Sequence, residues 1–122
     1  MTKRRILSVE DNPALAELMR TFLESEGFEV LEAGDGETAV RMAADEHPDL
    51  ILMDLQLPGI SGFEATRRIR SRYGLARTPI VAVTGFAMEM DAASAYAVGC
   101  DAYVTKPYDL DKLRETIQRY LK

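Results

Sequence analysis

The stretch Ile51–Gly59, ILMDLQLPG, joins a hydrophobic run directly to a carboxylate and then to a turn. The apolar residues that precede Asp54 suit a buried strand, and Pro58 and Gly59 end any regular element soon after it. A carboxylate at the end of a buried strand is unfavourable unless neighbouring groups interact with it. The stretch therefore indicates a buried strand that presents Asp54 to a functional edge of the fold.

On both sides of this stretch, short apolar runs alternate with amphipathic helical patterns. The predicted strands span residues 5–9, 28–33, 50–54, 79–84 and 102–105, and the predicted helices span 13–26, 36–46, 61–73, 88–99 and 110–121. Such alternation predicts an α/β fold, a parallel sheet with right-handed crossovers and helices on both faces. We expect the doubly wound (βα)5, flavodoxin-like three-layer sandwich with strand order 2-1-3-4-5, because a closed eight-stranded barrel needs about twice the length.

The composition is that of an ordinary globular chain, with 122 residues, 47% hydrophobic and 29% charged. We expect a single domain over residues 1–122 with no output domain. The formal charge of -5 argues against nucleic-acid binding, which needs clustered cations. No apolar run is long enough for a signal peptide or a membrane span, and the lone Cys100 excludes an intramolecular disulfide, so we expect a cytoplasmic protein.

Three local patterns have simple structural interpretations. Five of the eleven residues in 67–77 are arginines, which we interpret as a solvated helix face or a protein-docking surface. His47 has no second histidine or cysteine nearby and is interpreted as a surface residue. An apolar stripe at helical spacing predicts packing against the core by Leu110, Leu113, Ile117 and Leu121.

Polar residues that could carry chemistry follow the ends of four predicted strands. They are Glu10, Asp11, Asp54, Thr84 and Lys106. Because ligands bind beyond the carboxyl ends of the strands in open parallel sheets, we expect these side chains to converge. Taken singly, each has an ordinary interpretation as a loop start, a strand residue or a solvated amine. Their shared edge favours a site.

Three neighbouring carboxylates need a cation, since each close pair repels by about 4 kcal/mol at 4 Å and an effective dielectric near 20. Hard oxygen ligands of this kind suit Mg²⁺, and Lys106 would add a second, fixed positive charge. A divalent ion, an ammonium and a hydroxyl around a carboxylate make a site for phosphoryl transfer. Asp54 is then the predicted nucleophile, forming an acyl phosphate.

Four motifs together resemble the receiver domain of two-component response regulators. They are VEDN at Val9–Asn12, LILMDLQLPGISG at Leu50–Gly62, PIVAVTG at Pro79–Gly85 and AYVTKP at Ala102–Pro107. The resemblance spans essentially the whole chain. It implies a signalling switch that catalyses its own phosphorylation and dephosphorylation but turns over no external substrate.

The resemblance also implies a phosphoacceptor site and its metal. Asp54 would accept a phosphoryl group from a histidine kinase or a histidine phosphotransfer protein. Glu10, Asp11 and Asp54 would hold Mg²⁺, for which Mn²⁺ could substitute, and the backbone carbonyl of Gln56 would complete the site. The site is thus expected to depend on a divalent ion.

A conformational switch is implied in the same way. Thr84 and Lys106 would contact the phosphoryl group, and the ring of Tyr103 would rotate inward as Thr84 moves. The Lys106–Pro107 bond matches the cis peptide of the family. The switch would remodel the surface of the fourth helix, fifth strand and fifth helix and so change binding to a downstream protein. We expect a monomer, with dimerisation on phosphorylation left open.

Other positions vary the family pattern or tune it. Gln56 and Phe86 lie two residues beyond Asp54 and Thr84, where the family controls access of water to the acyl phosphate, and we expect Phe86 to slow dephosphorylation. Ser8 and Gly85 depart from the commonest residues, and neither removes a required group. In the fourth helix, Met88 and Met90 offer either an adaptable apolar surface or core packing.

Two other classes of function remain as alternatives. A Mg²⁺-dependent phosphohydrolase of the haloacid dehalogenase type also uses a strand-end aspartate, but it places a second aspartate where this chain has Gln56. A phosphorylation-independent binding module, such as a flavodoxin-type one, would need a phosphate loop rich in glycine and hydroxyls, whereas residues 10–14 read EDNPA. The chain could also be a domain of a hybrid kinase or of a longer regulator.

Overall fold

Five strands alternate with five helices in the computed structural model, which describes residues 3–72, 74–84, 89–106 and 109–121. The strands are β1 (Arg5–Val9), β2 (Glu29–Ala33), β3 (Leu50–Asp54), β4 (Ile80–Thr84) and β5 (Ala102–Thr105). The helices are α1 (Pro13–Ser25), α2 (Gly36–Glu46), α3 (Gly62–Arg70), α4 (Glu89–Ala97) and α5 (Leu110–Tyr120). These elements match the order predicted from the sequence.

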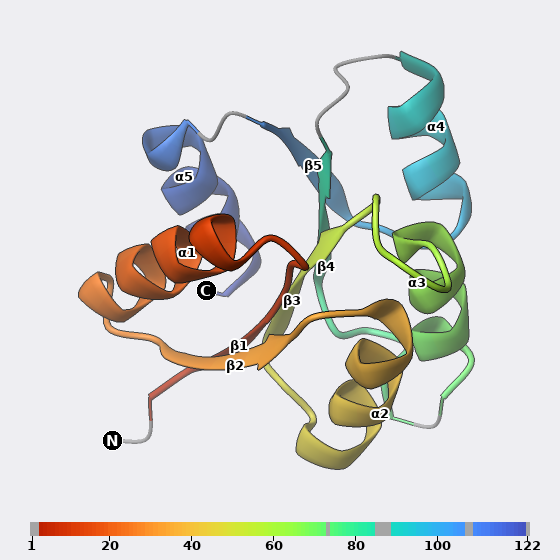
Figure 1. Ribbon diagram of the computed structural model, residues 1–122, viewed down its shortest axis with the longest axis horizontal. Helices are drawn as coiled ribbons and strands as arrows, with labels where there is room; N and C mark the ends of the chain where they lie inside the picture. The colour runs from red at the N-terminus through yellow and green to blue at the C-terminus, as the bar shows by residue number, and fades with distance from the viewer. Residues whose placement is uncertain (1–2, 73, 85–88, 107–108, 122) are drawn as a thin grey trace.

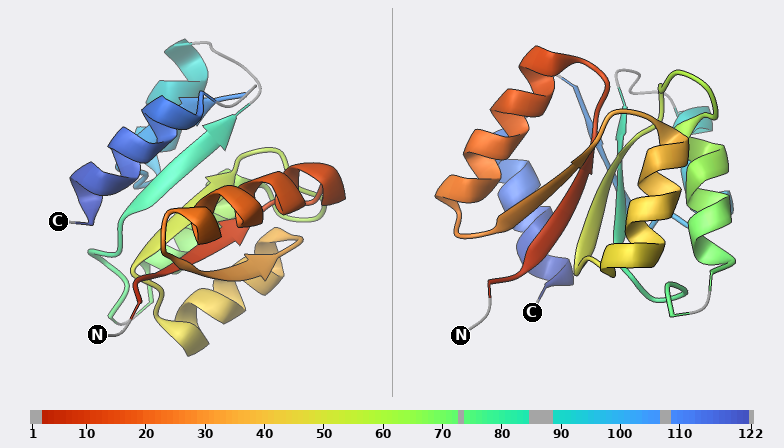
Figure 2. Two further views of the ribbon diagram at one scale, coloured as in Figure 1. Left: turned by 90° about the vertical axis from the view of Figure 1, so that its left-hand side faces the viewer. Right: turned by 60° about the horizontal axis from the view of Figure 1, so that its bottom comes forward.

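All strand pairs are parallel, and the sheet order is β2-β1-β3-β4-β5, as predicted (Figure 1). Helices α1 and α5 cover one face, and α2, α3 and α4 cover the other (Figure 2). The doubly wound, three-layer α/β architecture is therefore confirmed. Strands β2 and β5 form the two edges, and β3 lies at the centre with every residue buried.

Two hydrophobic clusters fill the spaces between the sheet and its helix layers. On the α1 and α5 side the largest fully buried side chains are Ile6, Leu23, Leu50, Leu52, Leu113 and Ile117. On the α2, α3 and α4 side they are Leu7, Ile51, Met53, Ile69, Leu75 and Ile80. Successive strand residues alternate between the two clusters, because side chains of a strand point alternately to opposite faces.

Side-chain caps fix where the helices begin. The Asn12 carboxamide oxygen accepts a hydrogen bond from the Leu15 N–H at 3.1 Å, with Pro13 at the first position of α1. The first turns of the other three helices with a described cap bond to Asp35, Ser61 and Asp109. Each cap satisfies an N–H group that the helix itself leaves without a partner.

Helix α3 ends at Arg70, whereas the sequence pattern predicts a helix to residue 73, a position outside the described residues. The chain tightens there, because the Arg72 N–H bonds to the Ile69 carbonyl, three residues back. Gly74 then adopts a φ of 83°, which turns the backbone away. The arginine-rich pattern therefore runs past the helix into a turn.

The arginine run proves to have two different roles. The exposed Arg67 and Arg68 pair with Glu64 on their own helix, as expected of a solvated face. The interpretation is wrong for Arg70, whose guanidinium donates to the carbonyls of Leu75 and Thr78, and to Gly99 and Asp101 in the turn before β5. Arg70 is thus a structural residue that ties α3 to two distant turns.

The other simple interpretations are confirmed. Leu113 and Ile117 are buried, and Leu110 and Leu121 pack against the same cluster. His47 is exposed at the C-terminal end of α2, and Cys100 is buried. None of the described helices has the length and apolar character needed to cross a membrane.

The edge strand β2 carries two acidic residues that face solvent and pair with arginines. Arg5 contacts Glu29 at 3.1 Å, and Arg20 on α1 contacts Glu32 at 2.9 Å. Exposed pairs of this kind contribute at most about 1 kcal/mol each. These ion pairs therefore place charged side chains along the edge strand but contribute little to the stability of the fold.

Candidate functional site

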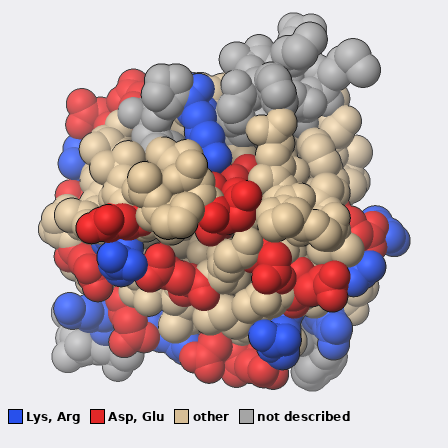
Figure 3. All heavy atoms as spheres, viewed as in Figure 1, with Lys and Arg blue, Asp and Glu red and all other residues tan. Residues whose placement is uncertain are grey.

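The carboxyl edge of the sheet brings together residues from three strands. Glu10 follows β1, Asp54 ends β3 and Lys106 follows β5. Val9 lies opposite Met53 in the parallel register, so the next residue on each strand is a neighbour across the edge. Figure 3 shows acidic atoms near the centre of the face where the strand ends meet in Figure 1.

The ammonium of Lys106 bridges the two buried carboxylates. Its Nζ lies 2.9 Å from Glu10 Oε1 and 3.1 Å from Asp54 Oδ2. The acidic side chains are only 4% and 3% exposed, whereas the lysine side chain is 20% exposed. Low exposure strengthens each ion pair, since water screens it poorly. Lys106 therefore offsets the repulsion between the acids.

Backbone N–H groups fix the second oxygen of each carboxylate. The Gln56 N–H donates to Asp54 Oδ1 at 2.9 Å, and the Asn12 N–H donates to Glu10 Oε2 at 3.2 Å. Both bonds span two residues and are made by the turn that follows the strand. Each carboxylate is thus held by an ammonium on one side and a backbone donor on the other.

The surroundings shift the pKa values of Asp54 and Glu10 in opposite directions. Burial raises the pKa of Asp54 to about 6, and the neighbouring Glu10 adds to this effect, although the Gln56 N–H and Lys106 oppose it. Burial also disfavours the charged form of Glu10, but hydrogen bonds from Lys106 and the Asn12 N–H outweigh it and leave its pKa below the ordinary value. Glu10 therefore holds the negative charge more firmly than Asp54 does.

The pKa of Lys106 is raised, although burial by itself would lower it. Burial disfavours its charged form, but hydrogen bonds to Glu10 and Asp54 raise its pKa above the ordinary value. The ammonium consequently stays charged throughout the neutral range.

Among the described residues, carboxylate oxygens of Glu10, Asp11 and Asp54 lie within 4.8 Å of one another. Asp11 is exposed, so the cluster is open to solvent on its side. A set of hard oxygen donors within this distance fits one divalent cation of the Mg²⁺ type, which binds one or two carboxylates and keeps several waters. The residues present therefore suit a magnesium site.

The start of α3 packs directly beneath Asp54. A Cβ on Gly62 would collide with the Asp54 carbonyl oxygen and lie 2.7 Å from the Leu55 Cα. The Gly62 N–H also bonds to the Leu55 carbonyl at 3.2 Å. This close approach folds the loop after β3 tightly against the helix. Sequence reasoning included Gly62 in a motif but gave it no role.

Four of the predicted site residues are thus adjacent: Glu10, Asp11, Asp54 and Lys106. Gln56 adjoins Asp54 through its N–H, and the metal-ligand role of its carbonyl stays a prediction. The backbone of Thr84 ends β4 opposite Thr105. The Thr84 side chain lies outside the described part of the structure, as do Gly85, Phe86, Pro107 and Met88 and the side chain of Met90.

Tyr103 lies on β5 and packs, partly buried, against the α2, α3 and α4 cluster. Its ring meets that of Tyr96 edge to face, with ring centroids 6.2 Å apart and an interplanar angle of 78°. Tyr96 on α4 is 50% exposed. This aromatic contact links α4 to β5 and was not predicted, because helical periodicity alone does not show which strand residue a tyrosine meets.

Comparison with known proteins gives a consistent result. Residues 6–118 match the sequence profile of the response regulator receiver domain. The chain is 41% identical over 121 residues to the polar-differentiation response regulator DivK of Brucella ovis, covering 99% of this chain and 98% of that protein. The DivK protein of Brucella anthropi is 39% identical over 118 residues, covering 97% and 96%.

Solved structures agree with the sequence relatives. The receiver domain of a sensor histidine kinase from Pseudomonas aeruginosa, with a magnesium ion coordinated in its active site cleft, has a TM-score of 0.92 and 37% identity, covering 98% of each chain. The chemotaxis protein CheY4 of Vibrio cholerae has a TM-score of 0.93 and 28% identity, covering 98% of this chain and all of the other. The chain therefore belongs to the family of response regulator receiver domains, which are switches of two-component signalling.

Proposed function

We propose that Asp54 is the phosphoacceptor of a two-component phosphorelay and that the transfer to it depends on Mg²⁺. The observation that carries this proposal is the buried Asp54 carboxylate, held between Lys106 and the Gln56 N–H and beside two further acidic side chains. Burial of the Asp54 carboxylate costs folding free energy, which indicates that the carboxylate is retained for a function. The magnesium-containing receiver of Pseudomonas aeruginosa supports the choice of ion.

The transfer is a substitution at phosphorus. A carboxylate oxygen of Asp54 attacks the phosphorus of an N-phosphohistidine on a kinase or phosphotransfer protein, and a phosphorus–oxygen bond forms as the phosphorus–nitrogen bond breaks. The electron pair stays on the imidazole nitrogen, which takes a proton from solvent. Lys106 neutralises charge that builds on the phosphoryl oxygens. Mg²⁺, held by Glu10, Asp11 and Asp54, would supply further positive charge there.

The acyl phosphate is then lost to water. A water oxygen attacks the phosphorus, inorganic phosphate leaves and the Asp54 carboxylate is restored. We propose that Gln56 and Phe86 set the rate of this step by controlling access of water, and that the carbonyl of Gln56 is a further metal ligand. The chain would in this way catalyse only its own phosphorylation and dephosphorylation.

The output is a change in protein binding. We propose that Thr84 moves toward the phosphoryl group and that the Tyr103 ring turns inward, shifting a population between two arrangements. The contact between Tyr103 and the exposed Tyr96 supports this route, because a turn of the Tyr103 ring would alter its contact with a residue on the surface of α4. A downstream protein that binds α4, β5 and α5 would read the change.

Intact mass spectrometry tests the proposal. The protein is incubated with acetyl phosphate and Mg²⁺, beside an EDTA sample and the variant Asp54→Asn. We expect one added phosphoryl group only in the wild type with Mg²⁺. Asp45→Asn, which changes an exposed aspartate on α2, is the matched control and should still gain the group. A phosphoryl group on Asp54→Asn, or one gained equally in EDTA, would contradict the proposal.

A further inference from the structure

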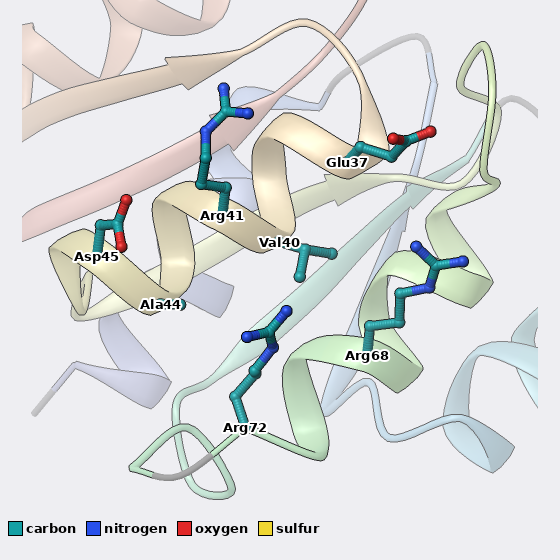
Figure 4. A pocket seen from close by; sticks show the side chains of 7 residues that line it. All are labelled: Glu37, Val40, Arg41, Ala44, Asp45, Arg68 and Arg72. Atoms are coloured by element: carbon teal, nitrogen blue, oxygen red, sulfur yellow. The ribbon is translucent and has the colours of Figure 1, made fainter.

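A groove of about 330 Å³ lies between α2 and α3, away from the acidic site (Figure 4). Its lining consists of Glu37, Val40, Arg41, Ala44, Asp45, Arg68 and Arg72. None of these residues belongs to the Glu10, Asp54 and Lys106 group. The volume falls in the range of about 300–1,000 Å³ that is usual for small-molecule sites.

Two guanidinium groups of the α3 side reach into the groove. Figure 4 shows Arg72, just after α3, extended toward Val40 and Ala44 of α2. The guanidinium of Arg68 lies along α3, toward the Glu37 end of the groove. Arg68 uses its Nε on Glu64 at 2.9 Å, which leaves its terminal nitrogens to donate elsewhere. Within the described residues, the side chain of Arg72 has no hydrogen-bond or ion-pair partner. The groove therefore holds unused guanidinium donors.

The opposite wall is formed by α2, where two apolar side chains lie among the charged Glu37, Arg41 and Asp45. Val40, which is 5% exposed and belongs to the hydrophobic cluster on this side of the sheet, and Ala44 line the groove from α2. Glu37 and Asp45 stand at opposite ends of this stretch of α2, away from the gap between the guanidiniums (Figure 4). The groove thus places the guanidinium of Arg72 beside two apolar side chains of α2.

We propose that this groove binds a phosphate-bearing anion, with its phosphate between Arg68 and Arg72. Guanidinium groups match phosphate oxygens in a two-pronged geometry, and two of them on one wall favour phosphate over a singly charged carboxylate. The organic part, as in a nucleoside monophosphate, would lie over Val40 and Ala44. The chain carries a net charge of -5, so this attraction is local to the groove.

Titration followed by amide chemical shifts tests the site in the full chain. Adenosine monophosphate, inorganic phosphate and adenosine are added separately in EDTA, without any phosphodonor. We expect saturable shifts in α2 and α3 with the two phosphates but not with adenosine. A tighter fit for the nucleotide would identify an organic phosphate as the ligand, and equal binding would identify free phosphate.

Variants separate this site from general electrostatics and from Asp54. Arg72→Gln, and separately Arg68→Gln, should weaken binding about tenfold. Arg119→Gln removes the same charge from an exposed position of α5 and should leave binding unchanged, as should Asp54→Asn. Absence of saturable shifts at millimolar ligand, equal weakening by Arg119→Gln, or equal binding of adenosine would overturn the proposal.

Discussion

The carboxylate of Asp54 lies in a site that favours its neutral form. Its pKa of about 6 in the folded protein compares with 3.8 for an ordinary aspartate, chiefly because of burial. The folded state therefore binds a proton more tightly than the unfolded chain does. Stability from this group is fully present below about pH 4 and is lost as the pH rises through about 6.

Replacement of Asp54 by asparagine should consequently stabilise the metal-free protein at neutral pH. The two-unit pKa difference corresponds to at most about 3 kcal/mol in the free energy of unfolding. At pH 8 in EDTA, we expect the free energy of unfolding of Asp54→Asn to exceed that of the wild type by up to this amount. The difference between the two free energies should disappear below pH 4. Urea denaturation across this pH range measures it.

Two comparisons sharpen that experiment. Asp45→Asn alters an exposed aspartate and should change the free energy of unfolding little at any pH. Added Mg²⁺ should narrow the gap at pH 8, because an ion that binds the folded wild type stabilises it. A gap that stayed constant from pH 4 to pH 8 would show that charge burial at Asp54 is not its cause.

At the scale of elements, the contact between α3 and β3 depends on a missing side chain. The Cα of Gly62 lies so close to the backbone of Asp54 and Leu55 that a methyl group has no room. Both contacting groups are backbone, so relief would require a shift of the helix or of the loop that holds Asp54. Helix packing and site geometry are thus coupled at one residue.

We expect Gly62→Ala to lower the free energy of unfolding by about 2 kcal/mol or more, as overpacking does in a well-filled interior. It should also slow phosphorylation of Asp54 by displacing the loop. Gly34→Ala is the matched control, because a Cβ there meets nothing within 4 Å. Urea denaturation and the rate of mass gain with acetyl phosphate measure the two effects. Equal stability of the two variants would contradict the packing argument.

A second element-level device is the guanidinium of Arg70. It donates hydrogen bonds to backbone carbonyls in the turn after α3 and in the turn before β5. It also forms an ion pair with Asp101 at 2.8 Å. Its side chain is only 17% exposed. Because these carbonyls belong to irregular backbone, the arginine replaces partners that regular structure would otherwise provide.

Arg70→Gln should therefore destabilise the fold by about 2–3 kcal/mol, since several charge-assisted hydrogen bonds are lost together. Arg67→Gln removes the same charge from the preceding turn of α3, where the Arg67 side chain is 67% exposed. That control should cost no more than about 0.5 kcal/mol. The difference between their urea midpoints is the measurement, and similar midpoints would show that Arg70 is not an anchor.

For the whole molecule, one sheet supplies both hydrophobic clusters. Since strand residues alternate between the clusters, neither helix layer can be lost without exposing the sheet that supports the other. The molecule should thus unfold in a single cooperative step, as most domains of this size do.

Shortening a buried side chain on either face of the sheet tests whether the molecule unfolds in a single cooperative step. Ile69→Ala on α3 and Ile117→Ala on α5 remove fully buried side chains from opposite clusters. Each should lower the free energy of unfolding by about 2–5 kcal/mol and move one common transition. Circular dichroism and tyrosine fluorescence should give the same midpoint for each variant. Separate midpoints for the two probes would mean that the helix layers unfold independently.

Much of this architecture could be predicted from sequence, because it follows from short-range patterns. Strand and helix periods fix the order of elements, and parallel strands bring their carboxyl ends to one edge. Glu10, Asp54 and Lys106 could be assigned to one site on that basis alone. The predicted helix over residues 61–73 was too long, because the chain leaves α3 after Arg70 in a tight turn closed by the Arg72 N–H on the Ile69 carbonyl, which helical periodicity does not reveal.

The features that sequence reasoning missed all join residues of different structural elements or turns. Arg70 looked like one of several surface arginines, and only the folded structure places Gly99 beside it. The need for glycine at position 62 and the meeting of Tyr96 with Tyr103 arise in the same way. Periodicity identifies which face of an element is buried, but it does not identify the partner.

The two edge strands have a consequence for crowded solutions. An open sheet offers unpaired backbone groups at its margins, which can recruit strands from other copies and seed ordered aggregates. Here β5 is only four residues long, and β2 carries Glu29 and Glu32 with their arginine partners, so an incoming strand would meet charged side chains that it would have to desolvate. Both edges therefore disfavour the addition of a strand from another copy.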